Sequence, residues 1–154
     1  MGGERKEVQS QFSRVSSLGY KFYRLAHLFA RTLDERLVKH GVSVGQFRVL
    51  LVLWESEDLT QVEIARYLNI EQPTVAITLK RMERDGLIKT MPDPLDGRRT
   101  RIVLTERGQM LKEPLTAEAH YINEVAVKGL SADEITQLHN LLDRLTNTFT
   151  TSDP

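Results

Sequence analysis

Hydrophobic residues recur at intervals of three and four positions along most of the chain, which is the pattern of amphipathic helices. The first such stretch covers residues 12–39 and is followed by Gly41, which is suited to end a helix. Further helices are predicted over residues 46–54, 60–68, 72–85 and 110–127, and a last one begins after Ser131. The helix over 46–54 is apolar on nearly all sides, which predicts that it is buried.

Polar residues and prolines mark where these helices begin and end. Asn69, which tolerates a left-handed backbone, and Gly86 predict turns on either side of the helix over 72–85. Thr105 is a simple N-cap, and Pro114 should kink the helix over 110–127 or delay its start. Three helix starts match the capping box, in which two side chains bond each other's backbone N–H groups: Ser43 with Gln46, Thr60 with Glu63, and Ser131 with Glu134.

The middle of the chain combines two short helices with a hairpin. A tight turn joins the helices over 60–68 and 72–85, which is the arrangement of a helix-turn-helix, although helix pairs also occur in plain packing. Strand-like runs at 87–91 and 101–104 then flank an arginine-bearing loop, which predicts a β-hairpin wing. The predicted fold is mainly α with a small hairpin (α+β): a winged helix-turn-helix flanked by further helices. The inward face of the second helix is predicted to consist of Val75, Leu79 and Met82.

Composition places the chain among globular proteins of a single domain. It has 154 residues, 40% hydrophobic and 27% charged, and the lack of cysteine excludes disulfides, thiolate catalysis and cysteine-ligated zinc. The longest apolar run, residues 49–54, is too short to cross a bilayer, and the first residues lack the apolar core of a signal peptide. We therefore expect a cytoplasmic protein, associated with the bacterial or archaeal nucleoid if it binds DNA, with no membrane partner.

Charge is unevenly distributed although the formal net charge is zero. Residues 71–101 contain seven Lys/Arg against five Asp/Glu, whereas residues 109–154 contain three against seven. A basic middle and an acidic end are typical of a chain that faces a polyanion with one surface only. Charges scattered over a solvated surface are the alternative interpretation.

The outward face of the helix over 72–85 suits the major groove of DNA. In that groove glutamine pairs with adenine and arginine with guanine, while threonine offers a hydroxyl and a methyl group to thymine. We expect base contacts from Gln72, Pro73, Thr74, Ile77, Thr78 and Arg81. We expect phosphate contacts from Thr60, Gln61, Lys80 and Arg84.

The loop of the predicted hairpin is expected to be a DNA-binding wing through Asp96, Arg98 and Arg99. Arginine at a wing tip suits the minor groove, whose negative potential deepens where A·T tracts narrow it. Asp96 is expected to hold a guanidinium by charge-assisted hydrogen bonds, and Gly97 to give the tip its turn freedom. Arg99 and Arg101 fit equally well as solvated strand residues.

Residues 59–108, "LTQVEIARYLNIEQPTVAITLKRMERDGLIKTMPDPLDGRRTRIVLTERG", resemble the winged helix-turn-helix of the MarR family of bacterial and archaeal regulators. "IEQPTV" and "MERDGLI" are most similar to its SlyA branch. The family's Asp-x-Arg wing signature matches at Asp96 and Arg98, and the Leu-Thr that closes the wing matches at residues 104–105. Glu71 departs from the Ser or Asp of many members, which leaves the register of the first turn of the helix over 72–85 open by one residue.

The resemblance implies a transcriptional regulator, usually a repressor, that binds a palindromic operator in double-stranded DNA as a homodimer. It also implies one MarR-like domain over residues 1–154, with the DNA-binding region at 42–108 and dimerisation helices at 10–40 and 109–150. Members of the family are often released from DNA by small phenolic ligands.

The hydrophobic pattern of the first and last helices independently predicts a homodimer. The two helices have more apolar surface than a core of this size can cover, and the alternative is a monomer that folds them onto its own middle. The last helix has a seven-residue repeat, typical of a coiled-coil-like contact, formed by Ile135, Leu138, Leu142, Leu145 and Phe149.

A stripe of polar and aromatic residues lies beside the apolar stripe of the first helix. The family resemblance implies an effector cleft between this region and the winged helix, where such groups would bind a phenol or an aromatic carboxylate. The alternative is that the tyrosines are interface residues with hydrated hydroxyl groups. The candidate ligand residues are Tyr20, Tyr23, Arg24 and His27.

No arrangement of residues typical of an enzyme is present. The four histidines lie on different predicted elements without ligand spacing such as HExxH, and there is no glycine-rich phosphate loop. We therefore predict no enzymatic activity, no cofactor and no metal site. Two alternatives to a DNA-binding regulator stay open: a winged helix that acts through protein or RNA contacts, and a metal-responsive regulator whose ligands meet only in space.

Overall fold

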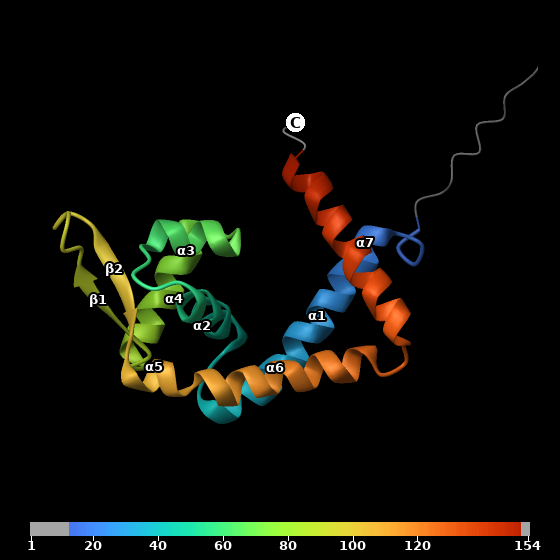
Figure 1. Cartoon of the computed structure of the whole chain (residues 1–154), viewed down its shortest axis with the longest axis horizontal. Coiled ribbons are helices and arrows are strands. Elements are labelled where there is room, and N and C mark those ends of the chain that lie inside the picture. Colours follow the sequence, from blue (N-terminus) through green and yellow to red (C-terminus); the bar gives the residue numbers. More distant parts are fainter. Residues whose placement is uncertain (1–12, 152–154) are drawn as a thin grey trace, which may run out of the picture.

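The computed structural model describes residues 13–151, which form two regions (Figure 1). The winged region contains α2 (Val44–Glu55), α3 (Gln61–Leu68), α4 (Gln72–Arg84), β1 (Ile88–Pro92), β2 (Thr100–Leu104) and α5 (Glu106–Met110). The second region contains α1 (Leu18–Leu37), the 3-10 helix η1 (Val38–His40), α6 (Lys112–Val127) and α7 (Ala132–Thr151). The predicted fold class, mainly helical with a two-stranded wing, is confirmed.

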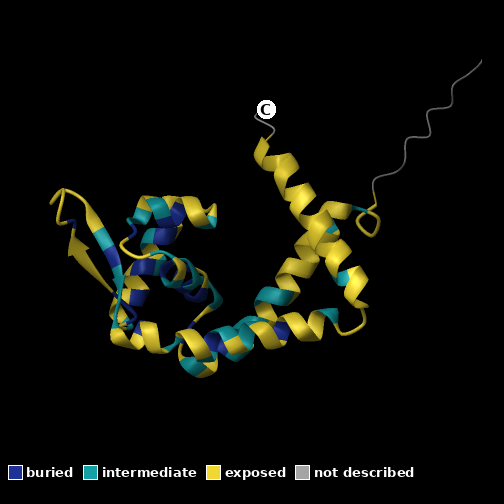
Figure 2. Ribbon diagram, in the orientation of Figure 1, coloured by how far each residue is buried: buried dark blue, intermediate teal, exposed yellow. Residues whose placement is uncertain are grey.

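The hydrophobic core lies mostly in the winged region (Figure 2). The predicted burial of α2 is confirmed, since Phe47, Val49, Leu50 and Leu53 are all buried. The predicted inward face of α4 is also confirmed, with Val75, Leu79 and Met82 buried. Leu37 at the end of α1 and Leu115 in α6 belong to the same core, so that this core connects the two regions.

The ends of the helices follow the predicted capping chemistry. The capping boxes that start α2 and α3 are both complete, and the Ser131 Oγ and the Glu134 carboxylate form the reciprocal pair that starts α7. The Thr105 Oγ1 accepts a hydrogen bond from the Gly108 N–H at 3.1 Å. The two turns that flank α4 need a left-handed backbone, and Asn69 (φ 51°) and Gly86 (φ 69°) supply it.

Two helix boundaries differ from the pattern-based expectation. α1 begins at Leu18 rather than at residue 12, which lies outside the described residues, because serines in the preceding segment bond the backbone locally instead of continuing a helix. Ser17 is the N-cap of α1, and its side chain accepts from the Tyr20 N–H. The helix predicted over 110–127 starts at Lys112, after a break at Leu111, which confirms the delayed start expected from Pro114.

The wing is a two-stranded antiparallel hairpin that packs against the helix-turn-helix. Its register pairs Ile88 with Leu104 at the base and Pro92 with Thr100 next to the loop. The Ile102 N–H of β2 also donates to the Leu59 carbonyl at 2.7 Å, which ties the wing to the segment between α2 and α3. This contact places the wing beside α3 and α4 (Figure 1).

The region built from α1, α6 and α7 has little core of its own. Figure 2 shows these helices mostly exposed, and α7 contains no buried residue. An apolar groove of about 420 Å³ lies between the three helices. Its walls consist of Phe22, Leu25, Leu28, Phe29, Thr32, Ile122, Val125, Ala126, Val127, Leu130, Leu138 and Leu142.

Candidate nucleic-acid interface

α4 presents a polar surface opposite its buried face. Thr74, Ile77 and Arg81 lie on the side of α4 away from the core, and the Ile77 side chain is 56% exposed. The Thr78 hydroxyl donates to the Thr74 carbonyl at 3.0 Å, so that Thr78 offers oxygen lone pairs and a methyl group rather than a hydroxyl hydrogen. Of the six predicted base-contacting residues, Thr78 is half-buried and the other five are exposed: Gln72, Pro73, Thr74, Ile77 and Arg81.

The turn between α3 and α4 defines the register that Glu71 had left open. Glu71 is the N-cap residue of α4, with an extended backbone and no side-chain capping bond, so the first helical residue is Gln72. Pro73 lies in the first turn, where its missing N–H has no partner to lose. The Thr74 and Val75 N–H groups both donate to the Glu71 carbonyl, so the polar group that this end of α4 exposes is the Gln72 side chain.

The three arginines of the wing have different surroundings. The Arg98 side chain forms no ion pair within the part of the chain that the structure describes. Arg99 lies 3.8 Å from the Glu63 carboxylate and keeps 54% of its side chain exposed. Arg101 is 22% exposed and binds both Asp58 and Asp93 at 3.0 Å, which makes it a structural residue rather than a solvated one. Of the three wing arginines, Arg98 and Arg99 are thus the two that are available to a ligand.

Asp93, which the sequence analysis did not single out, organises the wing loop. Asp93 is only 6% exposed, and its Oδ1 accepts hydrogen bonds from the Leu95 and Asp96 N–H groups at 2.8 and 3.3 Å. Its Oδ2 binds the Arg101 Nε. The Arg101 guanidinium, and then the Leu95 N–H, lower the pKa of the Asp93 carboxyl because both favour its charged form.

Two expectations about the wing tip are wrong. The Asp96 carboxylate accepts from the Arg98 backbone N–H at 3.1 Å and does not bind a guanidinium, because Asp93 is the carboxylate buried beside Arg101. Gly97 does not have a positive φ, so its lack of a side chain is not what allows the turn. The loop is shaped by carboxylate-to-backbone hydrogen bonds instead.

We predict that Asp93→Asn lowers the melting temperature at pH 7, because the amide keeps an acceptor oxygen but loses the ion pair with Arg101. The pKa of Asp93 is lowered in the folded state, so its charge stabilises the fold above the unfolded-state pKa of about 3.9. This contribution decreases as the pH falls below that value and is lost once the pH passes the lower pKa of the folded state. The melting temperatures of both proteins, measured from pH 7 downward, should therefore approach each other below about pH 3.9. A difference in melting temperature that stays constant over this range would contradict the role of the Asp93 charge.

A recess of about 570 Å³ lies between α3 and the loop end of β2. Gln61, Arg66 and Arg99 line it, so the structure brings a predicted phosphate contact next to a wing arginine. Thr60 also lines the recess, but its hydroxyl bonds the Glu63 carboxylate at 2.7 Å within the capping box. Arg66 also lines a neighbouring recess beside Gln72. The sequence reasoning did not name Arg66 as a phosphate contact, although its place as a cation in the last turn of the helix before the tight turn could have indicated it.

The predicted phosphate contacts on α4 differ in how free their charges are. Lys80 is exposed. The Arg84 Nε lies 2.9 Å from the Asp85 Oδ1, and this neighbour lowers the pKa of the Asp85 carboxyl. The Arg84 side chain is nevertheless 73% exposed, so a phosphate can still approach its guanidinium.

A buried glutamine connects the end of α4 to the start of α2. The Gln46 amide donates to the Asp85 Oδ2 at 2.8 Å, and its carbonyl accepts from the Ser43 N–H at 3.0 Å. Val44, the residue after Ser43, donates its N–H to the Asp34 carboxylate of α1 at 2.8 Å. The position of α4 is therefore linked to α1 through three consecutive polar contacts.

A second cluster joins α1 to α6. The Glu118 carboxylate binds the Arg36 guanidinium and lies 3.3 Å from the His40 ring. Arg36, first, and His40 lower the pKa of the Glu118 carboxyl, and the Arg36 guanidinium also stacks 4.0 Å from the centre of the Tyr121 ring. This half-buried cluster fixes the angle between the two helices that lead into the winged region.

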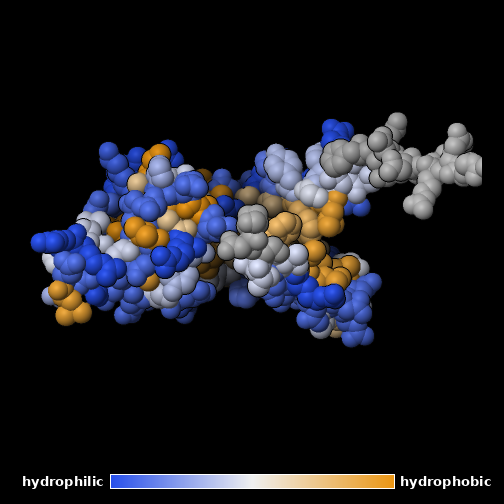
Figure 3. Space-filling view, turned by 90° about the horizontal axis from the view of Figure 1, so that it is seen from above, coloured by the Kyte–Doolittle hydropathy of each residue, from blue (hydrophilic) through white to orange (hydrophobic). Residues whose placement is uncertain are grey.

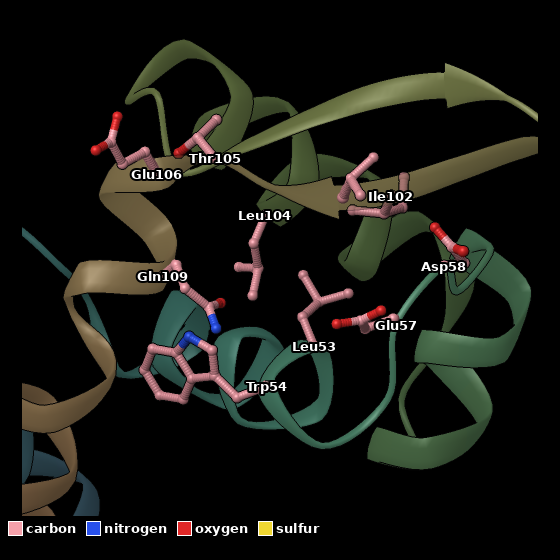
Figure 4. Close-up of a pocket in the computed structure, with 10 residues that line it drawn as sticks. Leu53, Trp54, Glu57, Asp58, Ile102, Leu104, Thr105, Glu106 and Gln109 are labelled. Carbon is pink, nitrogen blue, oxygen red and sulfur yellow. The ribbon is translucent and has the colours of Figure 1, made fainter.

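A further cavity of about 380 Å³ lies at the base of the wing between α2, β2 and α5 (Figure 4). Leu53, Trp54 and Leu104 contribute apolar side chains, and Figure 4 shows that Glu106 points away from the cavity. The Trp54 Nε1 donates to the Gly108 carbonyl at 3.1 Å, which holds α5 against α2. This cavity contains none of the predicted site residues.

The candidate ligand residues lie on the N-terminal half of α1, beside α7 and away from α2 to α4 (Figure 1). The Tyr23 ring stacks on the His27 ring with centroids 6.2 Å apart, and Tyr20 lies 6.3 Å from Tyr23. Tyr23, Arg24 and His27 are exposed, and none of the four lines the apolar groove. A single chain therefore does not bring this stripe against its own winged region.

No group of three or more His, Asp or Glu side chains in residues 13–151 is close enough to hold a metal ion. In the same part of the chain no helix has both the length and the apolar composition needed to span a bilayer.

The exposed α4, the tight turn that precedes it and the adjacent wing define a winged helix-turn-helix protein. The model of the MarR family matches residues 40–99. The transcriptional regulator TtmR of Methylorubrum extorquens is 34% identical over 140 residues, which cover 87% of this chain and 71% of the relative. The chain belongs to the MarR family, as its sequence indicated, and it is a DNA-binding transcriptional regulator.

Two other similar proteins add detail. The transcriptional repressor IacR of Pseudomonas putida is 29% identical over 127 residues, covering 80% of this chain and 76% of the relative. The crystal structure of a MepR–DNA complex from S. aureus superposes with a TM-score of 0.80 at 29% identity, covering 86% of this chain and 98% of that chain.

Proposed function

We propose that the protein is a homodimeric repressor that binds a palindromic operator in double-stranded DNA. The observation that carries this proposal is the exposed face of α4, with Thr74 and Arg81 at its centre, next to a wing whose Arg98 forms no ion pair with any residue of 13–151. The proposal is supported by the naming of IacR as a repressor and by the crystal structure of MepR in complex with DNA. Such a protein acts where the chromosome is, in the cytoplasm and at the nucleoid.

The contacts divide by chemistry into those that read bases and those that bind phosphates. On α4, Gln72, Pro73, Thr74, Ile77, Thr78 and Arg81 face the base edges of the major groove. Phosphates on either side of the groove are bound by Gln61, Lys80, Arg84 and Arg66, of which Arg66 was not predicted from the sequence. Thr60, the N-cap residue of α3, adds a weaker phosphate contact. Arg98 and Arg99 enter the adjacent minor groove, and the Asp96 carboxylate holds the loop backbone by accepting from the Arg98 N–H.

The dimer is proposed from the apolar groove that one chain leaves open. The heptad residues Leu138, Leu142 and Leu145 of α7 are 39%, 37% and 36% exposed, and Phe149 is 84% exposed. Figure 3 shows apolar side chains gathered on this side of the molecule. A second copy would cover residues from 10–40 and 109–150, whereas residues 42–108 would bind DNA. Two winged regions could then enter successive major grooves about 34–36 Å apart.

The test is to recover the genomic fragments that the purified protein protects and to measure its affinity for them. Affinity for a protected duplex should exceed affinity for random duplex by at least about 10³-fold at physiological salt. A single-stranded RNA of the same sequence should bind no better than random duplex. Equal affinity for all three would contradict a sequence-specific DNA regulator and favour the alternative of RNA or protein contacts.

Arg98→Ala should weaken operator binding by about 1–3 kcal/mol and reduce the preference for A·T-rich flanks. The reason is that Arg98 is the wing arginine with no ion pair in the described chain, so its whole charge is available to the minor groove. Fluorescence anisotropy with matched A·T-rich and G·C-rich flanks measures both effects. Arg48→Ala on α2 is the matched control, since it removes an exposed arginine that belongs neither to the proposed DNA contacts nor to the proposed dimerisation helices, and it should leave affinity unchanged. Equal binding by wild type and Arg98→Ala would remove Arg98 from the contact set.

We also propose that a small phenolic or aromatic carboxylate ligand regulates the dimer through Tyr20, Tyr23, Arg24 and His27. The stacked Tyr23 and His27 rings beside an exposed guanidinium offer an aromatic surface and a charge at one place on α1. Because this stripe lies away from the chain's own winged region, the second wall of a cleft would come from the other subunit. A ligand wedged there would favour a separation of the two α4 helices that does not fit DNA.

Salicylate should therefore raise the dissociation constant for operator DNA, and Arg24→Ala should weaken this effect without changing DNA affinity in its absence. To raise the dissociation constant a hundredfold, the ligand need only bind the dimer conformation that does not fit DNA more tightly than the DNA-binding conformation, by about 2.7 kcal/mol. The measurement is an anisotropy titration of the DNA complex with salicylate up to millimolar concentration. No response in the wild type would contradict this mode of regulation, and so would an unchanged response in Arg24→Ala.

A further inference from the structure

The wing tip exposes a large apolar side chain beside its arginines. Leu95 is 91% exposed, the highest fraction among the large apolar residues of the described chain. Single exposed leucines are common on protein surfaces and carry no argument by themselves. The surroundings of Leu95 are what distinguish it, because the other strongly exposed apolar residues mostly lie on helices whereas Leu95 lies at the end of a hairpin.

The backbone that carries Leu95 is held in one conformation by the loop itself. The Leu95 N–H donates to the buried Asp93 carboxylate at 2.8 Å, and the same carboxylate is bound by Arg101. Across the loop, the Asp93 N–H donates to the Arg99 carbonyl at 2.8 Å. Leu95 therefore stays extended away from the protein without a further loss of backbone entropy when it meets a partner.

The charges around Leu95 indicate the chemistry of that partner. Arg98 and Arg99 lie on the same loop with exposed side chains, and the loop follows the helix-turn-helix whose α4 is proposed to enter the major groove. A protein or lipid surface would not need cations and an apolar tip in register with a recognition helix. A DNA minor groove, with phosphates on its rims and stacked bases on its floor, presents both complements.

We propose that Leu95 is a specificity-determining residue that inserts into the minor groove and partly unstacks a flexible base step, and this proposal rests on the operator binding proposed above. Apolar side chains that enter the minor groove act as wedges between base pairs. The deformation costs least at pyrimidine–purine steps such as TA and CA. Leu95 would thus select such a step in the operator flank without any hydrogen bond to a base, while Arg98 and Arg99 hold the phosphates and the groove.

The test compares wild type, Leu95→Ala and Leu95→Met on protected duplexes in which the flanking TA or CA steps are replaced by AA. Wild type and Leu95→Met should lose about tenfold in affinity on replacement, because an apolar side chain that leaves water is worth roughly this much. Leu95→Ala should bind both duplexes equally. Since Leu95 is almost fully exposed, its truncation does not disturb the fold.

Two additional readouts separate a wedge from a general loss of binding. With 2-aminopurine placed in turn at each adenine of the flank, wild type should raise its fluorescence at one step and Leu95→Ala should not, because the dye brightens when it unstacks. The slope of log affinity against log salt should be unchanged in Leu95→Ala and reduced in Arg98→Ala, because only the arginine releases a counterion.

If wild type binds the operator but Leu95→Ala keeps the same step preference and the same fluorescence, the inference about Leu95 is overturned and the proposed function stands. If wild type binds no duplex specifically, the proposed function itself fails.

Discussion

Leu142→Asp should give a monomer that loses specific binding to the operator. Leu142 lines the apolar groove between α1, α6 and α7, and a carboxylate there would have to be buried unpaired between two subunits. A monomer contacts one half-site, and linking two such contacts typically raises affinity by about 10²–10⁴-fold, so a loss of that size is expected. Sedimentation velocity at micromolar concentration and anisotropy with the operator measure the two effects.

The matched control for this variant is Asn140→Asp. It adds the same charge to α7 at an exposed position that does not line the groove, so the dimer and its affinity for DNA should persist. A wild-type protein that sediments as a monomer would contradict the proposed assembly. So would a Leu142→Asp variant that stays dimeric and binds the operator normally.

Gly108→Ala should lower the free energy of unfolding by about 3 kcal/mol, at the upper end of the usual cost of overpacking. A Cβ at this position would lie 2.2 Å from the Leu87 carbonyl oxygen and 3.1 Å from the Leu104 Cδ2. The first neighbour is backbone, and the same Leu87 carbonyl accepts from the Thr105 N–H, so it cannot give way without opening the base of the wing. Chemical denaturation monitored by the fluorescence of Trp54, which bonds the Gly108 carbonyl, reports on this junction directly.

Gly129→Ala is the control for the glycine substitution. Nothing lies within 4 Å of a Cβ built at Gly129, and its backbone does not need a positive φ. Its free energy of unfolding should stay within about 0.5 kcal/mol of the wild type. Equal stability of Gly108→Ala and Gly129→Ala would show that α5 does not need to approach Leu87 as closely as the structure indicates.

The parts of the fold that depend on neighbouring residues were predictable from the sequence. Capping boxes at Ser43 and Thr60, the left-handed Asn69 and the delayed helix start two residues before Pro114 all follow from chemistry within a few positions. The alternation of buried and exposed positions on α4 followed from its periodicity for the same reason. Where two local preferences compete, as in the serine-containing segment before Leu18, periodicity alone extended the helix too far.

The parts of the site that depend on distant residues were not predictable. The sequence could not show whether Asp93 or Asp96 would bind an arginine, because the answer depends on the hairpin register that brings Arg101 beside Asp93. The contact between Gln46 and Asp85 joins residues 39 positions apart, and no pattern in either segment indicates it. The family's wing signature likewise marked Asp96 and Arg98 without showing that Asp93 is the residue that holds the loop.

The proposed mode of binding predicts that the protein reads DNA as a two-fold symmetric pair of winged regions. Hydroxyl-radical footprinting of the purified protein on a protected genomic site tests this most directly. We predict two equivalent protected segments centred one helical turn apart, about 10–10.5 base pairs, each flanked by minor-groove protection from a wing. A single unsymmetrical segment, or protection no stronger than on random duplex, would contradict it.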